Sequence, residues 1–376
     1  MSKLRELYDN AAQKDKSIKK ATFYSNEDIP EHFKTEVFGC GNPVRYIQGE
    51  FSNKVVLDIG CGAGIDIYYL SKKFKQSLLI GLDFSLDMLK RSKVNCEKSG
   101  VEAFFIQADI KHLPFKKEVI NTILSNACIH LIREKEQFFN ESFRVLKENS
   151  EMIISDIQTY KPWKNPFFLE EYKQTDGVFL YGGVEDKESY FNKLSNSKIQ
   201  YNIIKEEFFN PSADILPTVK AKHKNLSSEI EKEFKENLFI LTDYIAWKGD
   251  KKKFPAFVKC DCGEENIFDF YPRIPYGSKL FKKLKNNKIN IVKCKKCSKL
   301  IENEDSFMIT RPPKEVIFKF PEKWENVIDL NSNELKIKDT KLKVIKIFKN
   351  SELYQLINKE TILKDNFLTR FIKRLF

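Results

Sequence analysis

Short apolar runs alternate with segments of helical periodicity between residues 54 and 156, and this alternation constrains the fold more than any other feature. The runs are nearly continuous in apolar residues, as in strands that are buried on both faces. Strand and helix in alternation predict an α/β fold, in which helices cover both faces of a parallel sheet. The runs are KVVLDIG (54–60), LLIGLD (78–83), AFFIQAD (103–109), VINTILSN (119–126) and EMIISD (151–156), with helices expected at 65–74, 85–100 and 134–149 and one further strand at 202–209.

The net charge of +12 is confined to one half of the 376-residue chain. Residues 1–210 contain 30 Lys and Arg against 30 Asp and Glu, whereas residues 211–376 contain 35 against 23. This division predicts two parts with different partners, and a basic C-terminal half would suit a nucleic acid or another acidic partner. A lysine-rich solvated face explains the same charge without any partner.

Changes in composition along the chain predict five segments. A helical cap at 1–50 precedes the α/β domain at 51–210, and a charged helical connector at 211–255 leads to a small cysteine-containing domain at 256–305. The basic tail at 306–376 is expected to be α+β and to end in an amphipathic helix. No apolar run approaches the roughly 18 residues of a transmembrane segment, and the charged N-terminus lacks a signal core, so we expect a cytoplasmic protein.

The glycine-rich stretch LDIGCGAG (57–64) follows the first strand and opens the first helix. A dinucleotide-binding loop requires Gly or Ala where this chain has Ile65. Acids at the ends of the second and third strands, Asp83 and Asp109, instead suit the ribose hydroxyls and the adenine amine of S-adenosylmethionine. The predicted cofactor-binding residues are Asp58, Gly60, Gly62, Gly64, Asp83, Phe84, Asp109, Ile110 and Asn126.

The glycine loop and the acids at successive strand ends resemble the class I methyltransferase family over residues 1–210. Within that family, the segments LRELYDNAA (4–12), FGCGNPV (38–44), IISDI (153–157) and GVFLYGGVEDKESYFNKL (177–194) resemble the arsenite methyltransferases. The resemblance implies a Rossmann-like sheet, S-adenosylmethionine as methyl donor, and cysteine thiolates that hold the thiophilic arsenic. Cys40 occupies the position of one family cysteine, whereas Ala127 and Leu180 stand where two further arsenic ligands are expected.

The catalytic candidates are Cys40, Cys128 and His130. Cys128 lies one residue beyond the position of the expected ligand. If the strand continues through residue 128, this shift turns the thiol to the face opposite the pocket, and we favour a buried structural cysteine. If the chain has left the strand, the thiol could still reach the substrate. His130 would serve either as a general base or as a polar histidine of the core or the pocket rim.

Four cysteines in the C-terminal half form two close pairs, Cys260-x-Cys262 and Cys294-x-x-Cys297. Without an export signal this pattern favours a metal over disulfides, and four thiolates complete a tetrahedral Zn²⁺ site. The segment resembles the CpXC-type zinc-ribbon domain, although Lys259 stands where that family has its first cysteine. Four protein ligands leave no open position for catalysis, so a structural or recognition role is expected.

Three functions fit these features. The first is an S-adenosylmethionine-dependent methyltransferase that acts on a small molecule, arsenite-like or otherwise. The second is a methyltransferase that acts on a nucleic acid or a protein docked by the basic zinc-ribbon half. The third is a zinc-ribbon binding protein whose cofactor fold binds its ligand without turnover.

Overall fold

The protein is described from a computed structural model, and the chain divides into two compact units, residues 1–251 and 252–376. The residues that the structure describes are 8–9, 29–33, 40–47, 49–165, 167–168, 184–210, 212, 216–217, 220, 227–249, 253–270, 273–275, 292–301, 307–311, 315–319, 334–337 and 340–347.

The elements of the first unit follow the predicted alternation closely. In chain order the strands are β1 (Phe51–Ser52), β2 (Val55–Ile59), β3 (Phe74–Lys75), β4 (Leu78–Asp83), β5 (Phe104–Gln107), β6 (Ile120–Asn126), β7 (Leu146–Thr159), β8 (Gln200–Phe209) and β9 (Phe239–Trp247). The α-helices are α2 (Ile65–Lys73), α3 (Leu86–Lys98), α4 (Lys135–Val145), α6 (Lys187–Asn196) and α8 (Ser228–Glu236), and short 3-10 helices cover Glu31–Phe33, Pro43–Tyr46 and Ile129–Leu131.

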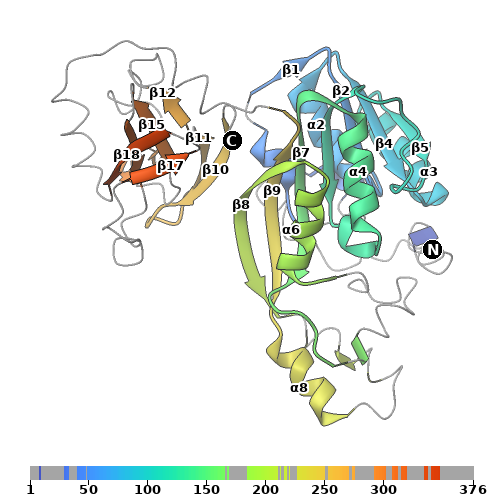
Figure 1. Ribbon diagram of the computed structural model, residues 1–376. Helices are drawn as coiled ribbons and strands as arrows, with labels where there is room; N and C mark the ends of the chain where they lie inside the picture. Colours follow the sequence, from blue (N-terminus) through green and yellow to red (C-terminus); the bar gives the residue numbers. More distant parts are fainter. Residues whose placement is uncertain are drawn as a thin grey trace. The chain divides into compact units, whose positions relative to one another are not determined.

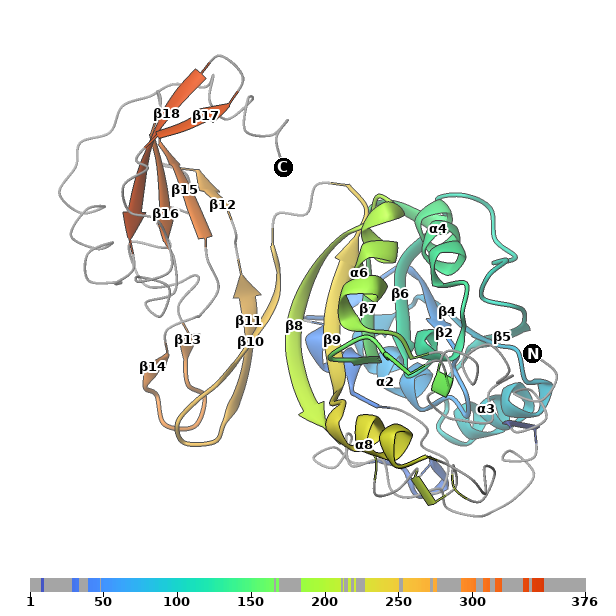
Figure 2. The same cartoon turned by 60° about the horizontal axis from the view of Figure 1, so that its bottom comes forward.

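Seven of these strands form one sheet in the order β5-β4-β2-β6-β7-β9-β8 (Figures 1 and 2). Strands β5, β4, β2, β6 and β7 run parallel to one another, which confirms the predicted parallel sheet, whereas β9 is antiparallel to both β7 and β8. The chain runs outward from β2 to β5 and then returns to β6 on the other side of β2. Ligands of open α/β sheets bind at such a reversal, outside the carboxyl ends of the strands.

Strand β9 corrects the prediction for residues 211–255. A charged helical connector was expected there, but residues 239–247 form a strand that pairs antiparallel with both β7 and β8. Each of its nine side chains is buried. The prediction is wrong because the apolar run FILTDYIAW lies between the charged residues of α8 and a lysine-rich stretch, so average composition hides it. Helix α8, within the same range, is helical as expected.

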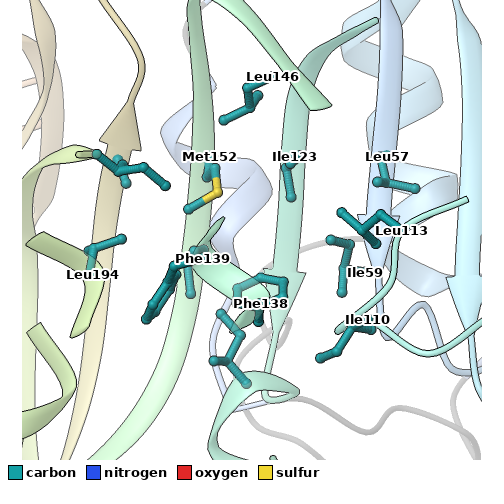
Figure 3. Close-up of a cluster of buried hydrophobic side chains, with 14 of the residues drawn as sticks. Leu57, Ile59, Ile110, Leu113, Ile123, Phe138, Phe139, Leu146, Met152 and Leu194 are labelled. Atoms are coloured by element: carbon teal, nitrogen blue, oxygen red, sulfur yellow. The ribbon is translucent and has the colours of Figure 1, made fainter. Parts of the chain in front are cut away.

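Helices cover both faces of the sheet. Helices α4 and α6 pack against each other on one face, while α2 and α3 lie on the other (Figures 1 and 2). Under α4 and α6 the core combines Phe138 and Phe139 with strand residues such as Leu57 and Met152, all fully buried (Figure 3). Helix α4 ends four residues earlier than predicted, because β7 begins at Leu146.

The second unit consists, in its described part, of small sheets. Strands β10 (Phe254–Lys259) and β11 (Glu265–Phe270) form an antiparallel hairpin, and β13 (Val292–Lys293) pairs with β14 (Leu300–Ile301). The other strands are β12 (Arg273–Pro275), β15 (Phe307–Arg311), β16 (Glu315–Lys319), β17 (Glu334–Ile337) and β18 (Thr340–Ile347), in the order β12-β15-β16-β18-β17. The predicted terminal helix lies outside the described residues. Within them, no helix has the length and apolar character that crossing a bilayer requires.

Candidate active site

A cleft opens at the carboxyl ends of β2, β4 and β6, where the sheet order reverses. Its free space, including the open mouth, is about 690 Å³. Seven of the nine predicted cofactor-binding residues line it, namely Gly60, Gly62, Asp83, Phe84, Asp109, Ile110 and Asn126. Tyr8, Met88, Ala127, Cys128, Leu131 and Ile132 complete the lining.

The glycine loop is held by the end of strand β4. The backbone N–H groups of Gly60 and Cys61 donate to the carbonyl oxygen of Leu82, at 2.8 and 3.1 Å. The Asp83 carboxylate accepts from the N–H of Gly62 at 3.0 Å and from the N–H of Ser85 at 2.9 Å. Burial raises the pKa of Asp83, and these two hydrogen bonds oppose the rise. The acid that ends β4 is therefore fixed at the wall of the cleft.

Two predicted cofactor residues do not line the cleft. Gly64 is the N-cap of α2, and a Cβ atom there would lie 2.4 Å from the Ser92 hydroxyl oxygen. Asp58 is 1% exposed, and its Oδ2 atom has no hydrogen-bond partner within the described part of the chain. Burial raises the pKa of Asp58 well above its usual value, and the nearby Asp66 and Asp83 add to the rise. A buried, unsatisfied carboxylate oxygen is the kind of group that a cationic ligand would stabilise.

Asp109 follows β5 and faces the cleft. Its Oδ1 atom accepts from the N–H of Lys111 at 2.9 Å, and Lys111 Nζ lies 3.7 Å from its Oδ2 atom. The carboxylate thus lines the cleft while local bonds fix its orientation.

Cys128 lines the cleft, which corrects the favoured expectation that it points away. Strand β6 ends at Asn126, and Ala127 has a φ of 56°, so the alternation of faces no longer applies at residue 128. The thiol packs directly against Gly60 and is half-buried. Burial raises the pKa of this thiol well above its usual value, and Asp83 and Asp156 add to the rise. Ala127, which replaces an expected arsenic ligand, also lines the cleft, whereas Leu180 lies outside the described residues.

Cys40 is buried beside the cleft and is not one of its lining residues. Its Sγ lies 3.4 Å from the carbonyl oxygen of Ser155, and its N–H donates to Asn126 Oδ1 at 3.1 Å. Burial raises the pKa of the Cys40 thiol, and the charges of Asp156 and Asp243 add to the rise. The thiol is therefore protonated at neutral pH in this arrangement.

His130 belongs to the core. It is 4% exposed, and its Nδ1 atom lies 2.7 Å from Asp156 Oδ1. The other carboxylate oxygen accepts from the Tyr190 hydroxyl at 2.9 Å, and that hydroxyl lies 2.8 Å from the Tyr244 hydroxyl. His130 is not one of the cleft's lining residues, so a role as general base remains a prediction without a contact to support it.

Tyr8 was not among the predicted site residues, although it lies in the segment 4–12 that resembles the arsenite methyltransferases. Its ring packs edge-on against Phe84 with centroids 5.8 Å apart, and the next residue, Asp9, accepts from the Ser85 hydroxyl at 2.5 Å. Burial raises the pKa of Tyr8, and Cys128 and Asp83 add to the rise. A single tyrosine in a charged N-terminal stretch follows no periodicity, so only the tertiary contact reveals it.

The structure brings the four cysteines of the second unit together. Their sulfur atoms all lie within 4.8 Å of one another, with 3.5 Å between Cys260 and Cys297 and 3.6 Å between Cys262 and Cys294. A tetrahedral site with Zn–S bonds of about 2.3 Å requires sulfur–sulfur distances of roughly 3.8 Å, so the donor set fits the metal.

Two similar turns present these cysteines. The N–H of Cys260 donates to the Glu264 carbonyl, and the N–H of Cys294 donates to the Lys299 carbonyl, both at 2.8 Å. Among the described residues, no other group of three or more Cys, His, Asp or Glu side chains is close enough to hold a metal ion. Cys40 and Cys128 are thus not part of such a group.

The sheet order, the glycine loop and the acidic cleft define a class I S-adenosylmethionine-dependent methyltransferase domain. A family model described as a methyltransferase domain matches residues 50–208.

Among curated proteins, the arsenite methyltransferase of Halobacterium salinarum is 28% identical over 164 residues, which is 43% of this chain and 42% of that protein. The human arsenite methyltransferase is 29% identical over 173 residues, 43% of this chain and 45% of that protein. A malonyl-[acyl-carrier protein] O-methyltransferase of a Methylovorus species is 34% identical over 111 residues, 28% of this chain and 37% of that protein. The chain spans less than half the length of each of these relatives.

Proposed function

We propose that the chain transfers a methyl group from S-adenosylmethionine to a small-molecule acceptor bound beside Cys128. The donor would lie on the glycine loop, with Asp83 accepting from the ribose hydroxyls and Asp109 accepting from the adenine amine. The observation that carries the proposal is that Cys128 shares one cleft with Asp83 and Asp109.

The titratable side chains of the cleft limit the kinds of acceptor that it could methylate. Asp83 and Asp109 are assigned to the donor, which leaves Tyr8 and Cys128 among the described lining residues. Burial raises the pKa of both groups, so neither is a base at neutral pH. We therefore propose an acceptor whose nucleophilic atom needs no deprotonation, such as trivalent arsenic with its lone pair. The similarity to arsenite methyltransferases supports this choice.

S-adenosylmethionine supplies a methyl group that is activated on a sulfonium. The work left to the chain is to orient the acceptor in line with that methyl group and to exclude water. Leu131, Ile132 and Ala127 provide an apolar wall for this purpose. The polarisable thiol of Cys128 would contact the soft acceptor directly.

The test measures the release of S-adenosylhomocysteine by the full chain with arsenite and glutathione, with total tRNA, and without an acceptor. We expect release with arsenite and a decrease of at least about tenfold in the Cys128→Ser variant. Cys96→Ser is the matched control, because Cys96 is buried and does not line the cleft. Release with tRNA alone would transfer the proposal to a macromolecular acceptor, and no release under any condition would overturn it.

We also propose that the four clustered cysteines hold Zn²⁺. With four protein ligands the site has no open coordination position, so the metal would stabilise the turns between β10 and β11 and between β13 and β14. The fit of the sulfur–sulfur distances to a tetrahedral site supports this proposal.

A further inference from the structure

The side-chain amide of Asn126 is fully engaged by the protein itself. Its Oδ1 atom accepts from the backbone N–H groups of Cys40 and Gly41, each at 3.1 Å. Its Nδ2 atom donates to the Gly41 carbonyl at 2.9 Å and to Asp66 Oδ2 at 3.2 Å. An amide offers two acceptor sites and two donors, and these four bonds use all of them. Asn126 is 5% exposed, so the bonds are sheltered from water.

The segment that Asn126 binds fits tightly against the sheet. A Cβ atom at Gly41 would lie 2.5 Å from the Ser155 hydroxyl oxygen and 3.0 Å from Asp243 Oδ1, so only glycine fits there. The Ser155 hydroxyl donates to Asp243, and the Tyr46 hydroxyl donates to the other oxygen of that carboxylate at 2.5 Å. The segment is thus attached at both ends, through Asn126 near Cys40 and through Asp243 near Tyr46.

The position of Asn126 connects this segment to the cleft. It is the last residue of β6, and the next two residues, Ala127 and Cys128, line the cleft. Asp66, which it also binds, lies in the first turn of α2, directly after the glycine loop. One amide therefore joins the Cys40 segment, the helix that follows the glycine loop, and the cleft wall that carries Cys128.

We propose that Asn126 is a positioning residue that fixes the Cys40 segment against the acceptor side of the cleft, rather than a residue that binds the methyl donor through its amide. This inference rests on the proposed function, because it assigns the Cys40 segment to the acceptor side of that site. It is nevertheless testable without turnover, since releasing Asn126 changes the access of reagents to the buried Cys40 thiol.

The decisive variant is Asn126→Asp. The carboxylate can still accept from the N–H groups of Cys40 and Gly41, but it cannot donate to the Gly41 carbonyl and it repels the Asp66 carboxylate. Asn121→Asp is the matched control in the same strand. Asn121 lies near the opposite end of β6, where its Oδ1 atom accepts from the Val55 N–H at 2.9 Å and from Lys147 Nζ at 3.2 Å. Both of these bonds survive the control substitution.

The first readout is the rate at which N-ethylmaleimide alkylates each cysteine of the folded full chain, measured by peptide mass spectrometry. We expect Cys40 to react at least about tenfold faster in Asn126→Asp than in the natural protein, and to be unchanged in Asn121→Asp. Cys96, which is 1% exposed in the same unit, reports general unfolding and should remain protected in all three proteins.

The second readout is the affinity for S-adenosylhomocysteine, measured by calorimetry. We expect Asn126→Asp to bind within about threefold of the natural protein, because the donor contacts assigned to Asp83 and Asp109 are intact. Unchanged Cys40 reactivity would overturn the inference, as would a loss of affinity of more than about tenfold with Cys40 still protected. If the natural protein binds no S-adenosylhomocysteine, the proposed function fails, and the alkylation rates still decide whether Asn126 holds Cys40.

Discussion

Gly60 and Cys128 touch across the floor of the cleft: a Cβ atom on residue 60 would lie 2.5 Å from the Cys128 sulfur and 2.7 Å from its Cβ. Gly60 also has a φ of 73°, a left-handed conformation that a residue with a side chain adopts at a cost of about 1–2 kcal/mol. The first glycine of the loop and the thiol after β6 therefore fix each other's positions.

Gly60→Ala should consequently weaken the binding of S-adenosylhomocysteine by at least about tenfold, because either the loop or Cys128 must move. Calorimetry with the purified full chain measures this loss. The left-handed backbone at residue 60 contributes to this loss of affinity whatever residue stands at position 128. The contribution of the contact with Cys128 therefore has to be measured separately.

A double-mutant cycle with Cys128→Gly isolates the contact. Removing the Cys128 side chain leaves room for the new methyl group, so the Gly60→Ala change should cost less in the Cys128→Gly background, by about 1 kcal/mol or more. Equal losses in the two backgrounds would show that the backbone strain at residue 60 is the whole effect.

The parallel part of the sheet was predictable because its strands are continuous apolar runs between amphipathic helices. Strand β9 was not, because its buried run at 239–247 lies within a charged stretch and pairs with β7, about 90 residues away in sequence. Only long-range antiparallel pairing reveals it, and local periodicity carries no information about such pairing.

The position of Asp83 and Asp109 in one cleft was predictable for a similar reason. Asp83 and Asp109 follow apolar runs, and the carboxyl ends of parallel strands meet at one edge of the sheet. The proposed acceptor side depends on backbone details instead. The positive φ of Ala127 turns Cys128 toward the cleft, and the hydrogen bonds of Asn126 place Cys40. Neither feature has a periodic signature in the sequence.

If Asp83 accepts from the ribose hydroxyls, as proposed, donor binding should be sensitive to pH. Ribose hydroxyls donate to the carboxylate form, and burial raises the pKa of this group above its ordinary value of 3.8. As the pH falls, Asp83 is thus protonated earlier than an exposed aspartate, and the affinity for S-adenosylhomocysteine should fall with it. In Asp83→Asn the affinity should be at least about tenfold lower at neutral pH and nearly constant across the acidic range. Calorimetry from pH 7 down to the onset of unfolding measures the affinity of the natural protein and of the variant. If the affinity of the natural protein does not change with pH, Asp83 does not bind the ribose hydroxyls.

Lys135 should make the free energy of unfolding of the first unit depend on pH in the alkaline range. Its side chain is fully buried, with Nζ donating to the Ile132 carbonyl at 2.5 Å, and burial lowers its pKa from 10.5 to about 8. Between these two values the unfolded chain binds a proton that the folded chain does not, so stability rises with pH. The difference between these two pKa values corresponds to a change of at most about 3 kcal/mol in the free energy of unfolding.

Lys135→Met removes this contribution while keeping an unbranched chain of similar length. Urea unfolding gives the free energy of unfolding of both proteins at pH 8 and at pH 10. Between these two pH values, this free energy should rise less, or fall more, in the variant than in the natural protein. The comparison uses the difference between the two proteins, which cancels the titration of other groups. Identical pH dependences would mean that Lys135 is charged in the folded protein throughout this range.

The four-cysteine cluster should bind one zinc ion per chain, measured by inductively coupled plasma mass spectrometry on protein purified without chelators. Cys294→Ser removes a buried thiolate from the tetrahedral set and should lower the zinc content by at least about tenfold. Cys96→Ser serves as control and should keep one zinc ion per chain.

Hydrogen exchange of the Cys294→Ser variant should show lost protection in β10, β11, β13 and β14, because the metal replaces a core that is too small to hold these short strands. Binding of S-adenosylhomocysteine should be unchanged, since the cleft lies wholly within residues 1–251. Stoichiometric zinc in Cys294→Ser would refute the four-thiolate site.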